Sequence, residues 1–211
     1  MPPERDMQGD TRTRLLEAAE RVLIEEGVMA LTMRRVGDVS GLNPTLITYH
    51  FGTVAMLLAN LRDHNMGPML EDWACLEDPI PAGGDPLDIL LERWLRPLLA
   101  PACFTPSGRA LVVLDEIAAH GEGETAARLV ETMSEVADRF ASLLTPHLPG
   151  LDRQELRWRL RFIAGAALGP PPRARLGPDE RDPAMSEEAL AALTRFCRAA
   201  LTGAHHTATA R

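Results

Sequence analysis

Hydroxyl-bearing side chains are spaced along residues 44–51 in a way that suits contact with DNA. At 100° per residue, Thr45, Thr48 and Tyr49 fall on one arc of a helix, with Leu46 on its shoulder. Hydroxyls bond phosphates or base edges, and methyl-bearing side chains contact thymine methyl groups. The face therefore suits a DNA groove, although a solvated helix face with Tyr49 packed on a neighbour has the same pattern.

Two short helices separated by a turn are predicted to position these groups. Thr32 is placed to cap the first helix, and Gly41 follows as a residue able to take the left-handed conformation that ends a helix. Asn43 is placed to cap the second helix, with Pro44 at its first position, where a missing N–H costs nothing. A helix, a glycine-containing turn and a capped helix are the sequence form of a helix-turn-helix.

Catalytic and metal-binding motifs are missing from the sequence. It contains no GxGxxG, Walker, GxSxG or HExxH motif. His64, His120 and His147 are scattered without partners at ligand spacing, and His205 and His206 fall in a C-terminal tail that is expected to fray. We therefore expect no enzyme activity, no catalytic residue, no metal and no cofactor.

The composition is that of a chain without a membrane span or a disulfide framework. With 211 residues and 45% hydrophobic content, it can bury the core of one or two small domains. No apolar run reaches the roughly 18 residues of a membrane span, and the first ten residues do not resemble a signal peptide. Cys75, Cys103 and Cys197 are odd in number and widely spaced, which favours reduced thiols in a cytoplasm.

Net charge gives no support for binding to nucleic acid. The chain carries −8, and residues 1–52 hold six arginines against eight acidic residues. Position can outweigh this sum, because Arg34 and Arg35 lie in the first turn of the first short helix, and Arg12 and Arg14 open the helix before it. We expect Arg34 to contact phosphate.

The features around the helix pair are Gly27 closing the preceding helix, Thr32 opening the next, Gly41 in the turn, and Tyr49-His50-Phe51 at the end. With them, residues 11–60 closely resemble the N-terminal domain of TetR-type transcriptional regulators. Two positions depart from the family pattern. Thr48 stands where an aromatic residue is usual, and Val54 stands where a lysine that often contacts phosphate is usual.

The resemblance implies a homodimer whose two recognition helices enter successive major grooves of operator DNA. It also implies that a small molecule bound in the C-terminal domain changes the spacing of the two DNA-binding heads and relieves repression. The residues expected at the DNA are Thr32, Arg34, Asn43, Pro44, Thr45, Thr48, Tyr49 and His50.

The whole chain is predicted to be all-α, with about nine helices. An N-terminal three-helix helix-turn-helix domain (residues 1–52) precedes a helical ligand-binding and dimerisation domain (residues 53–211). The first ten residues are expected to be a flexible arm. The later helices are expected to begin near residues 53, 86, 106, 124, 152 and 186. Pro68 is expected to kink or end the helix that starts near residue 53.

Tryptophan and methionine are concentrated in the helices predicted after residue 53, which suggests a site for an apolar effector. These residues are equally good core residues, and Asp115 among them could instead reach solvent or an arginine. The candidate ligand pocket comprises Met66, Met69, Trp73, Trp94, Leu98, Phe104, Val113, Asp115, Ile117 and Met133.

The helix predicted over residues 152–169 is apolar on two opposite faces, so it must bury one face against something other than its own core. We interpret it, with the helix over residues 186–202, as a dimer-forming pair, with simple intrachain packing as the alternative. The candidate interface residues are Trp158, Phe162, Gly165, Gly169, Leu190, Leu193, Cys197 and Leu201. A helical ligand- or partner-binding protein that has lost specific operator affinity is the alternative function.

Overall fold

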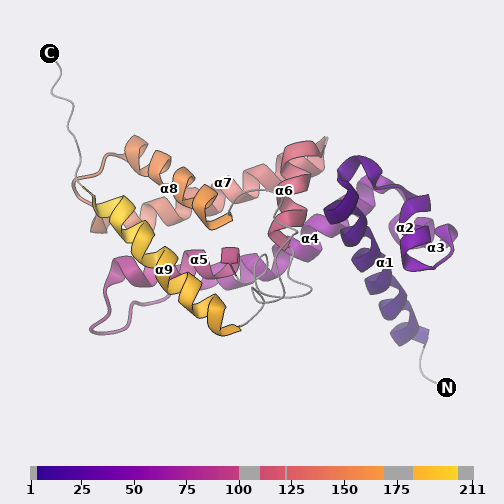
Figure 1. Cartoon of the computed structure of the whole chain (residues 1–211), viewed down its shortest axis with the longest axis horizontal. Coiled ribbons are helices and arrows are strands. Elements are labelled where there is room, and N and C mark those ends of the chain that lie inside the picture. Colours follow the sequence, from indigo (N-terminus) through magenta and orange to yellow (C-terminus); the bar gives the residue numbers. More distant parts are fainter. Residues whose placement is uncertain (1–3, 100–109, 122, 169–182, 204–211) are drawn as a thin grey trace, which may run out of the picture. The chain divides into compact units, whose positions relative to one another are not determined.

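The computed structural model describes residues 4–99, 110–121, 123–168 and 183–203. These residues form an all-α protein, as predicted, with no strand in the described ranges. The helices are α1 (Glu4–Glu26), α2 (Met33–Ser40), α3 (Pro44–Phe51), α4 (Val54–Trp73), α5 (Pro86–Leu99), α6 (Ala110–His120), α7 (Glu124–Leu144), α8 (Arg153–Leu168) and α9 (Pro183–Thr202). Short 3-10 helices η1 (Val28–Ala30), η2 (Ala74–Glu77) and η4 (Thr145–His147) lie between them (Figure 1).

The chain divides into two compact units by its internal contacts. The first unit comprises residues 1–68 and 110–132, and the second comprises residues 69–109 and 133–211. Helices α4 and α7 each contribute residues to both units. The boundary predicted between residues 52 and 53 therefore lies inside the first unit. None of the helices in the described ranges combines the length and apolarity needed to cross a bilayer.

The first unit is built on α1, which packs against α2, η1 and α6, while α2 packs against α3 (Figure 1). Apolar residues recur on one side of α1 at helical spacing, and they are almost completely buried. This core comprises Leu15, Leu16, Ala18, Ala19, Val22 and Leu23 of α1, Val36 of α2, and Ile47 and Phe51 of α3. The burial of one face of α2 and α3 leaves the opposite face of α3 exposed.

Helix α1 begins at Glu4, so the expectation of a flexible arm over the first ten residues was wrong for residues 4–10. The helix therefore begins well before the apolar stripe, which starts at Leu15.

A carboxylate of α6 holds the turn that follows α1. Gly27 ends this helix with φ of 86°, a left-handed conformation that favours glycine. The backbone N–H of Val28 then donates to Glu116 Oε1 at 3.0 Å, and Glu116 Oε2 lies 3.2 Å from Nδ1 of His120. The first donor of η1 is thus satisfied by a side chain from a distant part of the chain.

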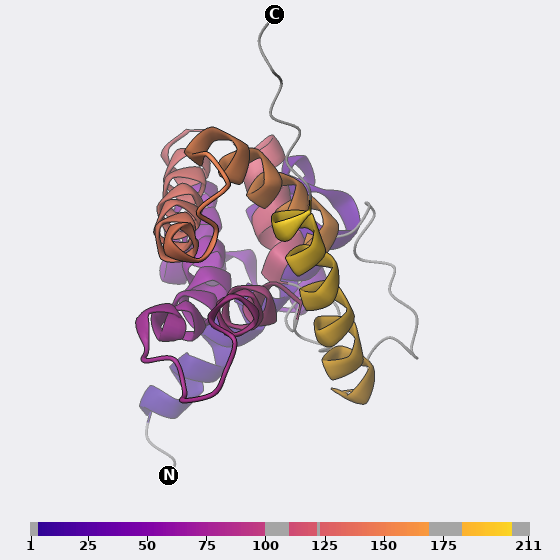
Figure 2. The ribbon, with the colours of Figure 1, turned by 90° about the vertical axis from the view of Figure 1, so that its left-hand side faces the viewer.

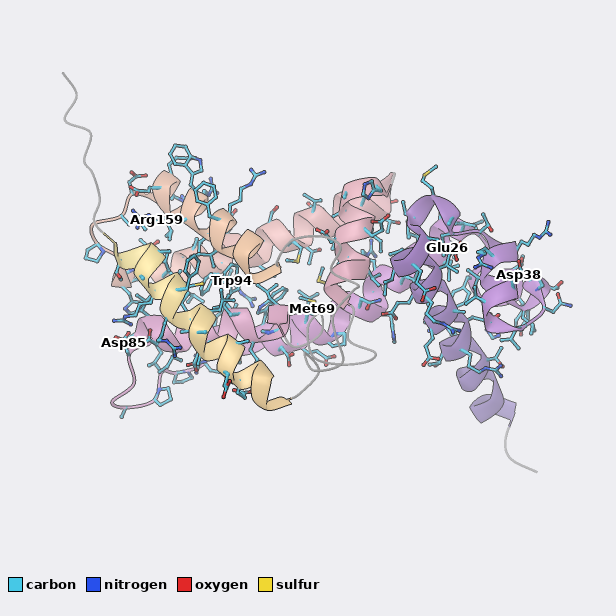
Figure 3. The ribbon with its side chains drawn as sticks, viewed as in Figure 1. Glu26, Asp38, Met69, Asp85, Trp94 and Arg159 are labelled. Atoms are coloured by element: carbon cyan, nitrogen blue, oxygen red, sulfur yellow. The ribbon has the colours of Figure 1, made fainter. Side chains whose placement is uncertain are left out.

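The second unit is centred on α5, which packs against α9, α8 and η2. Helices α8 and α9 lie side by side in both views (Figures 1 and 2). Trp94 stacks on Phe140 with ring centroids 4.5 Å apart, and the buried indole N–H of Trp73 donates to the Trp94 carbonyl at 3.0 Å (Figure 3). This arrangement buries two large aromatic rings and satisfies the polar group of Trp73.

Ion pairs join α5 to α9 at two places. Arg198 lies 2.8 Å from carboxylate oxygens of both Asp85 and Asp88, and Arg96 lies 2.6 Å from Glu187. Asp85 also accepts the N–H of Leu87 at 2.9 Å, as expected for the cap of α5. The hydrogen bond from Arg198 holds the pKa of the Asp85 carboxyl below its ordinary value.

Helix α4 continues through Pro68 to Trp73, so of the two expectations for this proline, a kink or an end of the helix, the second is not met. In α7, Val130 is exposed, although it is apolar and adjoins the buried Leu129. Residues 129 and 130 lie 100° apart around a helix, and Leu129 is the one that is buried. The helix start predicted near residue 106 lies outside the described residues.

Candidate nucleic-acid interface

Local hydrogen bonds form the predicted helix-turn-helix in the first unit. The Thr32 hydroxyl accepts the N–H of Arg35 at 3.1 Å and caps α2, which ends at Gly41 with φ of 68°. Asn43 Oδ1 accepts the N–H of Thr45 at 2.9 Å and caps α3, with Pro44 in its first turn. Each cap satisfies a backbone donor that would otherwise lack a partner. The caps and the left-handed glycine confirm the local structure predicted from the sequence.

Inside the turn, Ser40 and Gly37 fix the approach of α3 to α2. The Ser40 hydroxyl donates to the Gly37 carbonyl and accepts the N–H of Leu42, each at 3.2 Å. A Cβ atom on Gly37 would lie 2.8 Å from Pro44 Cγ and 3.2 Å from the Leu42 carbonyl oxygen. The two helices therefore meet at a residue that has no room for a side chain.

The outward face of α3 is the exposed surface that the sequence predicted. Thr45, Thr48 and Tyr49 are all exposed, and the Tyr49 side chain has 72% of its surface accessible. His50 is half-buried between two rings, with an edge-to-face contact to Tyr49 and a tilted contact to Phe51. Leu46, which the sequence placed on the shoulder of this arc, is 37% exposed.

The arginines of the first unit differ in whether their guanidinium groups already have partners within the protein. Arg34 and Arg14 are exposed and have no hydrogen bond or ion pair within the described ranges. Arg35 is engaged by Glu26, which accepts from its Nε at 2.9 Å and from its Nη2 at 2.8 Å. Arg12 donates to the side chain of Asn60 and stacks over the Phe51 ring.

The pairing of Arg35 with Glu26 changes the electrostatics of the predicted interface. It holds the pKa of the Glu26 carboxyl below its ordinary value, because Arg35 donates hydrogen bonds to the ionised form. The pair joins the end of α1 to the first turn of α2 (Glu26 is labelled in Figure 3). Arg34 is therefore the cation of this turn that remains available to a phosphate.

All eight residues predicted to contact DNA lie on one continuous segment from Thr32 to His50 in the first unit. Thr32 and Asn43 use their side-chain oxygens as helix caps, so only their remaining polar groups are available. Pro44 is exposed but packs its ring near Gly37. The sequence analysis placed Leu46 on the shoulder of this face but did not count it among the eight DNA-contact residues, and its exposed side chain adds it to the surface.

The residues predicted for a ligand pocket fall in different units. Met66, Val113, Asp115 and Ile117 belong to the first unit; Met69, Trp73, Trp94, Leu98 and Met133 belong to the second; Phe104 lies outside the described residues. Asp115 and Met133 are half-buried, and the other described members are buried. A surface pocket of about 350 Å³ in the second unit includes Cys75, Ile89 and Pro97 in its lining, but none of the predicted residues.

The predicted dimer residues separate into exposed and buried groups. On α8, Trp158 and Phe162 are 56% and 72% exposed, and Gly165 is exposed. On α9, Leu190, Cys197 and Leu201 are buried and Leu193 is half-buried, whereas the neighbouring Phe196 is exposed. Gly169 lies outside the described residues. Among the described side chains of α8 and α9, the large exposed apolar ones are Trp158, Phe162 and Phe196.

A capped helix-turn-helix on a helical scaffold defines a DNA-binding regulator. Residues 15–61 match the family model described as bacterial regulatory proteins of the tetR family, and residues 92–200 match the tetracyclin repressor-like C-terminal domain. The chain therefore belongs to the TetR family of transcriptional regulators. A comparison with curated proteins found no match.

Solved structures share the fold at low sequence identity. A TetR-like transcriptional regulator from Rhodococcus sp. RHA1 has a TM-score of 0.67 and 16% identity, over 92% of this chain and 96% of that chain. A TetR-family member from Streptomyces coelicolor A3 has a TM-score of 0.65 and 19% identity, over 90% of each chain. The regulator FadR from Bacillus subtilis, in complex with stearoyl-CoA, has a TM-score of 0.61 and 14% identity, over 92% of this chain and 100% of that chain.

Proposed function

We propose that the protein is a repressor that binds a palindromic operator as a homodimer and is released by a small apolar effector. The observation that carries this proposal is the exposed face of α3, where Thr45, Thr48 and Tyr49 project from a helix whose opposite face is buried. An uncovered face of hydroxyls on the second helix of a helix-turn-helix suits a major groove. In this proposal residues 1–52 bind DNA, and residues 53–211 form the regulatory and dimerisation domain of a non-enzymatic cytoplasmic protein.

The proposed dimer uses the apolar surface of α8 and α9. Trp158, Phe162 and Phe196 are exposed although each could bury a large apolar area. Trp158 and Phe162 are four residues apart and therefore share one face of α8, and exposed apolar side chains on one face support burial against another apolar surface. A two-fold symmetric pairing would bring the same surface of a second copy against it and would give the operator two half-sites.

The proposed effector is an apolar molecule held by the regulatory domain, with the ten residues named from the sequence as candidates. The concentration of Trp and Met residues among them supports an apolar or aromatic ligand. The solved FadR from Bacillus subtilis is in complex with stearoyl-CoA, which supports testing long acyl chains first. Release requires the effector to bind the DNA-incompetent state more tightly, because only differential affinity shifts an equilibrium.

Selection of bound duplexes from random DNA fragments by the purified protein tests the proposed function. We expect an enriched palindrome with two half-sites, and we expect an effector to lower its retention. The control is the same selection with a double variant that carries Thr48→Ala and Tyr49→Ala. Both side chains are exposed, so their removal leaves the core intact. Enrichment of no sequence over background would reject operator binding.

A second candidate function is a ligand- or partner-binding protein without specific operator affinity. Val54 is exposed where the family usually carries a lysine, and Arg35 is neutralised by Glu26. Residues 1–52 also carry more acidic than basic residues. Retention on DNA that does not fall as salt is raised would favour this candidate, because phosphate contacts weaken with salt.

A further inference from the structure

The exposed face of α3 lacks the side chains that usually read three of the four bases. Helix α3 spans Pro44–Phe51 and is described throughout, and it contains no Arg, Lys, Asn, Gln, Asp or Glu. Arginine and lysine usually read guanine, asparagine and glutamine read adenine, and acidic side chains read cytosine. The nearest amide, Asn43, has its oxygen engaged by the N–H of Thr45. Apart from the half-buried imidazole of His50, base readout by α3 therefore depends on hydroxyl and apolar groups.

Leu46 is an apolar side chain left exposed on this face. It is 37% exposed, whereas the next residue, Ile47, is completely buried in the core of the first unit. Thr45 and Thr48 are exposed and each carries a methyl group. An apolar side chain gains free energy when it leaves water for an apolar surface. In the major groove, the apolar group that a base presents is the C5-methyl of thymine.

We infer that Leu46 is a specificity-determining residue that recognises the C5-methyl group of a thymine in each operator half-site. This inference rests on the proposed function, because it requires α3 to enter a major groove. The threonine methyl groups extend the same apolar surface, and their hydroxyls bond the neighbouring base edges or phosphates. Thymine methyl contact then supplies the sequence preference that charged readers supply in other recognition helices.

The charges of the first unit fit this form of readout. The charge of Arg35 is paired with Glu26, and the guanidinium of Arg12, although still charged, is held by the side chain of Asn60, so Arg35 supplies less sequence-independent attraction to phosphate. The exposed side chains at the start of α4 include Val54 and Met56, which are apolar as well. A head with a paired cation and an apolar reading surface gains a larger share of its affinity from contacts with bases.

Replacement of single thymines by uracil tests the inference directly, because uracil keeps every hydrogen-bonding group and lacks only the methyl. The probe is the duplex enriched by selection, with one thymine at a time replaced. Loss of one buried methyl is expected to weaken binding by about fourfold, and symmetric replacement in both half-sites by about fifteenfold. Uracil placed outside the protected half-sites is the matched DNA control and should leave affinity unchanged.

The Leu46→Ala variant assigns the contact to its side chain. It should bind the uracil duplex and the thymine duplex with equal affinity at the position that Leu46 contacts, while Thr45→Ser should keep most of the discrimination at that position. Leu46 is 37% exposed, so its truncation removes some packing, and circular dichroism with a cooperative unfolding transition checks that the DNA-binding head of the variant is folded. If a folded Leu46→Ala variant still prefers the thymine duplex over the uracil duplex as strongly as the wild type does, Leu46 is not the residue that contacts the methyl group.

Two further results separate failure of this inference from failure of the proposed function. If an operator is selected and no uracil substitution weakens binding, DNA binding stands and thymine methyl readout is rejected. Replacement of guanines by 7-deazaguanine then tests hydrogen bonding to guanine by His50 or the threonines. If only these replacements weaken binding, thymine methyl readout is likewise rejected. If no operator is selected, both the proposed function and this inference fail.

Discussion

Gly37 approaches Pro44 so closely that a Cβ atom on the glycine would lie 2.8 Å from Cγ of the proline ring. This contact fixes where α3 meets α2, and thereby which face of α3 is turned outward. The proline ring is rigid, and the Leu42 carbonyl oxygen lies 3.2 Å from the same Cβ position. A side chain at residue 37 therefore requires backbone movement in the helix-turn-helix.

We predict that Gly37→Ala lowers the free energy of unfolding by about 1–3 kcal/mol and weakens DNA binding, because the added methyl separates α2 from α3. Chemical denaturation followed by circular dichroism measures the first effect. Gly67→Ala is the matched control: Gly67 is helical, with no described atom within 4 Å of its Cβ position, so this change should stabilise by about 0.5–1 kcal/mol. Equal stability of Gly37→Ala and wild type would show that the turn adapts.

Glu26→Gln is predicted to strengthen binding to random duplex DNA. It releases the charge of Arg35, which then becomes available to phosphate in the first turn of α2. One additional phosphate contact per protomer would steepen the slope of log affinity against log salt by about two for a dimer. Glu25→Gln is the matched control, since it removes the same charge without breaking the pair. If both variants gain the same affinity for random duplex DNA, the effect comes from the change in net charge and not from the release of Arg35.

The helix-turn-helix was predictable because its signals are local. Thr32 and Asn43 accept backbone N–H groups two or three residues along the chain, and Gly41 acts through its own φ angle. The spacing of Thr45, Thr48 and Tyr49 then identified the outward face. These inferences need only helical geometry and the chemistry of neighbouring residues.

Pairings between elements were beyond prediction from the sequence. Arg34 and Arg35 are adjacent and chemically identical, yet Glu26 engages only Arg35, because the turn after α1 decides which side chain it reaches. The carboxylate of Glu116 reaches Val28 across 88 residues of sequence. On α9, the stripe of Leu190, Cys197 and Leu201 indicated an apolar face, but only the packed structure shows that its own chain covers that face.

Phe162→Arg is predicted to convert the proposed dimer into monomers. The side chain is exposed in the protomer, so the charge is tolerated there, but a symmetric interface would bury two unpaired charges. Light scattering across a concentration series measures the change. Met29→Arg introduces the same charge at an exposed apolar residue of η1 and should stay dimeric. A Phe162→Arg protein that remains a dimer would place the interface elsewhere.

The Arg198 pair predicts a pH-dependent link between α5 and α9. Because the hydrogen bond from Arg198 lowers the pKa of folded Asp85, its contribution to stability is present above the unfolded pKa of about 3.9. That contribution is lost as pH falls through the lower folded pKa. Asp85→Asn should therefore lower the melting temperature at neutral pH, and the difference from wild type should shrink as pH falls below about 4.

The Asp85→Asn substitution isolates charge from capping, because the asparagine oxygen can still accept the N–H of Leu87. Asp78→Asn removes an exposed carboxylate that forms no ion pair with Arg198 and should leave the melting temperature close to that of the wild type. If the melting temperatures of Asp85→Asn and the wild type differ by the same amount at every pH, the role of the ion pair is contradicted.

The central claim is that the outward face of α3 reads bases while Arg34 at the start of α2 holds the backbone. Thr48→Ala and Tyr49→Ala should each cost about 1–3 kcal/mol on the operator and much less on scrambled duplex. Arg34→Ala should weaken binding to both duplexes alike, and it should lower the salt slope by about one contact per protomer. The Tyr49 hydroxyl can also reach a phosphate, in which case Tyr49→Ala weakens both duplexes as Arg34→Ala does.

The most direct test is the affinity of the wild type and these variants for operator and scrambled duplex at several salt concentrations. We expect Thr48→Ala to lose the preference for operator with an unchanged salt slope, and Arg34→Ala to keep the preference with a shallower slope. Thr45→Ala, Thr48→Ala and Tyr49→Ala proteins that all bind the operator as wild type does would contradict it, and α3 would not be the recognition helix.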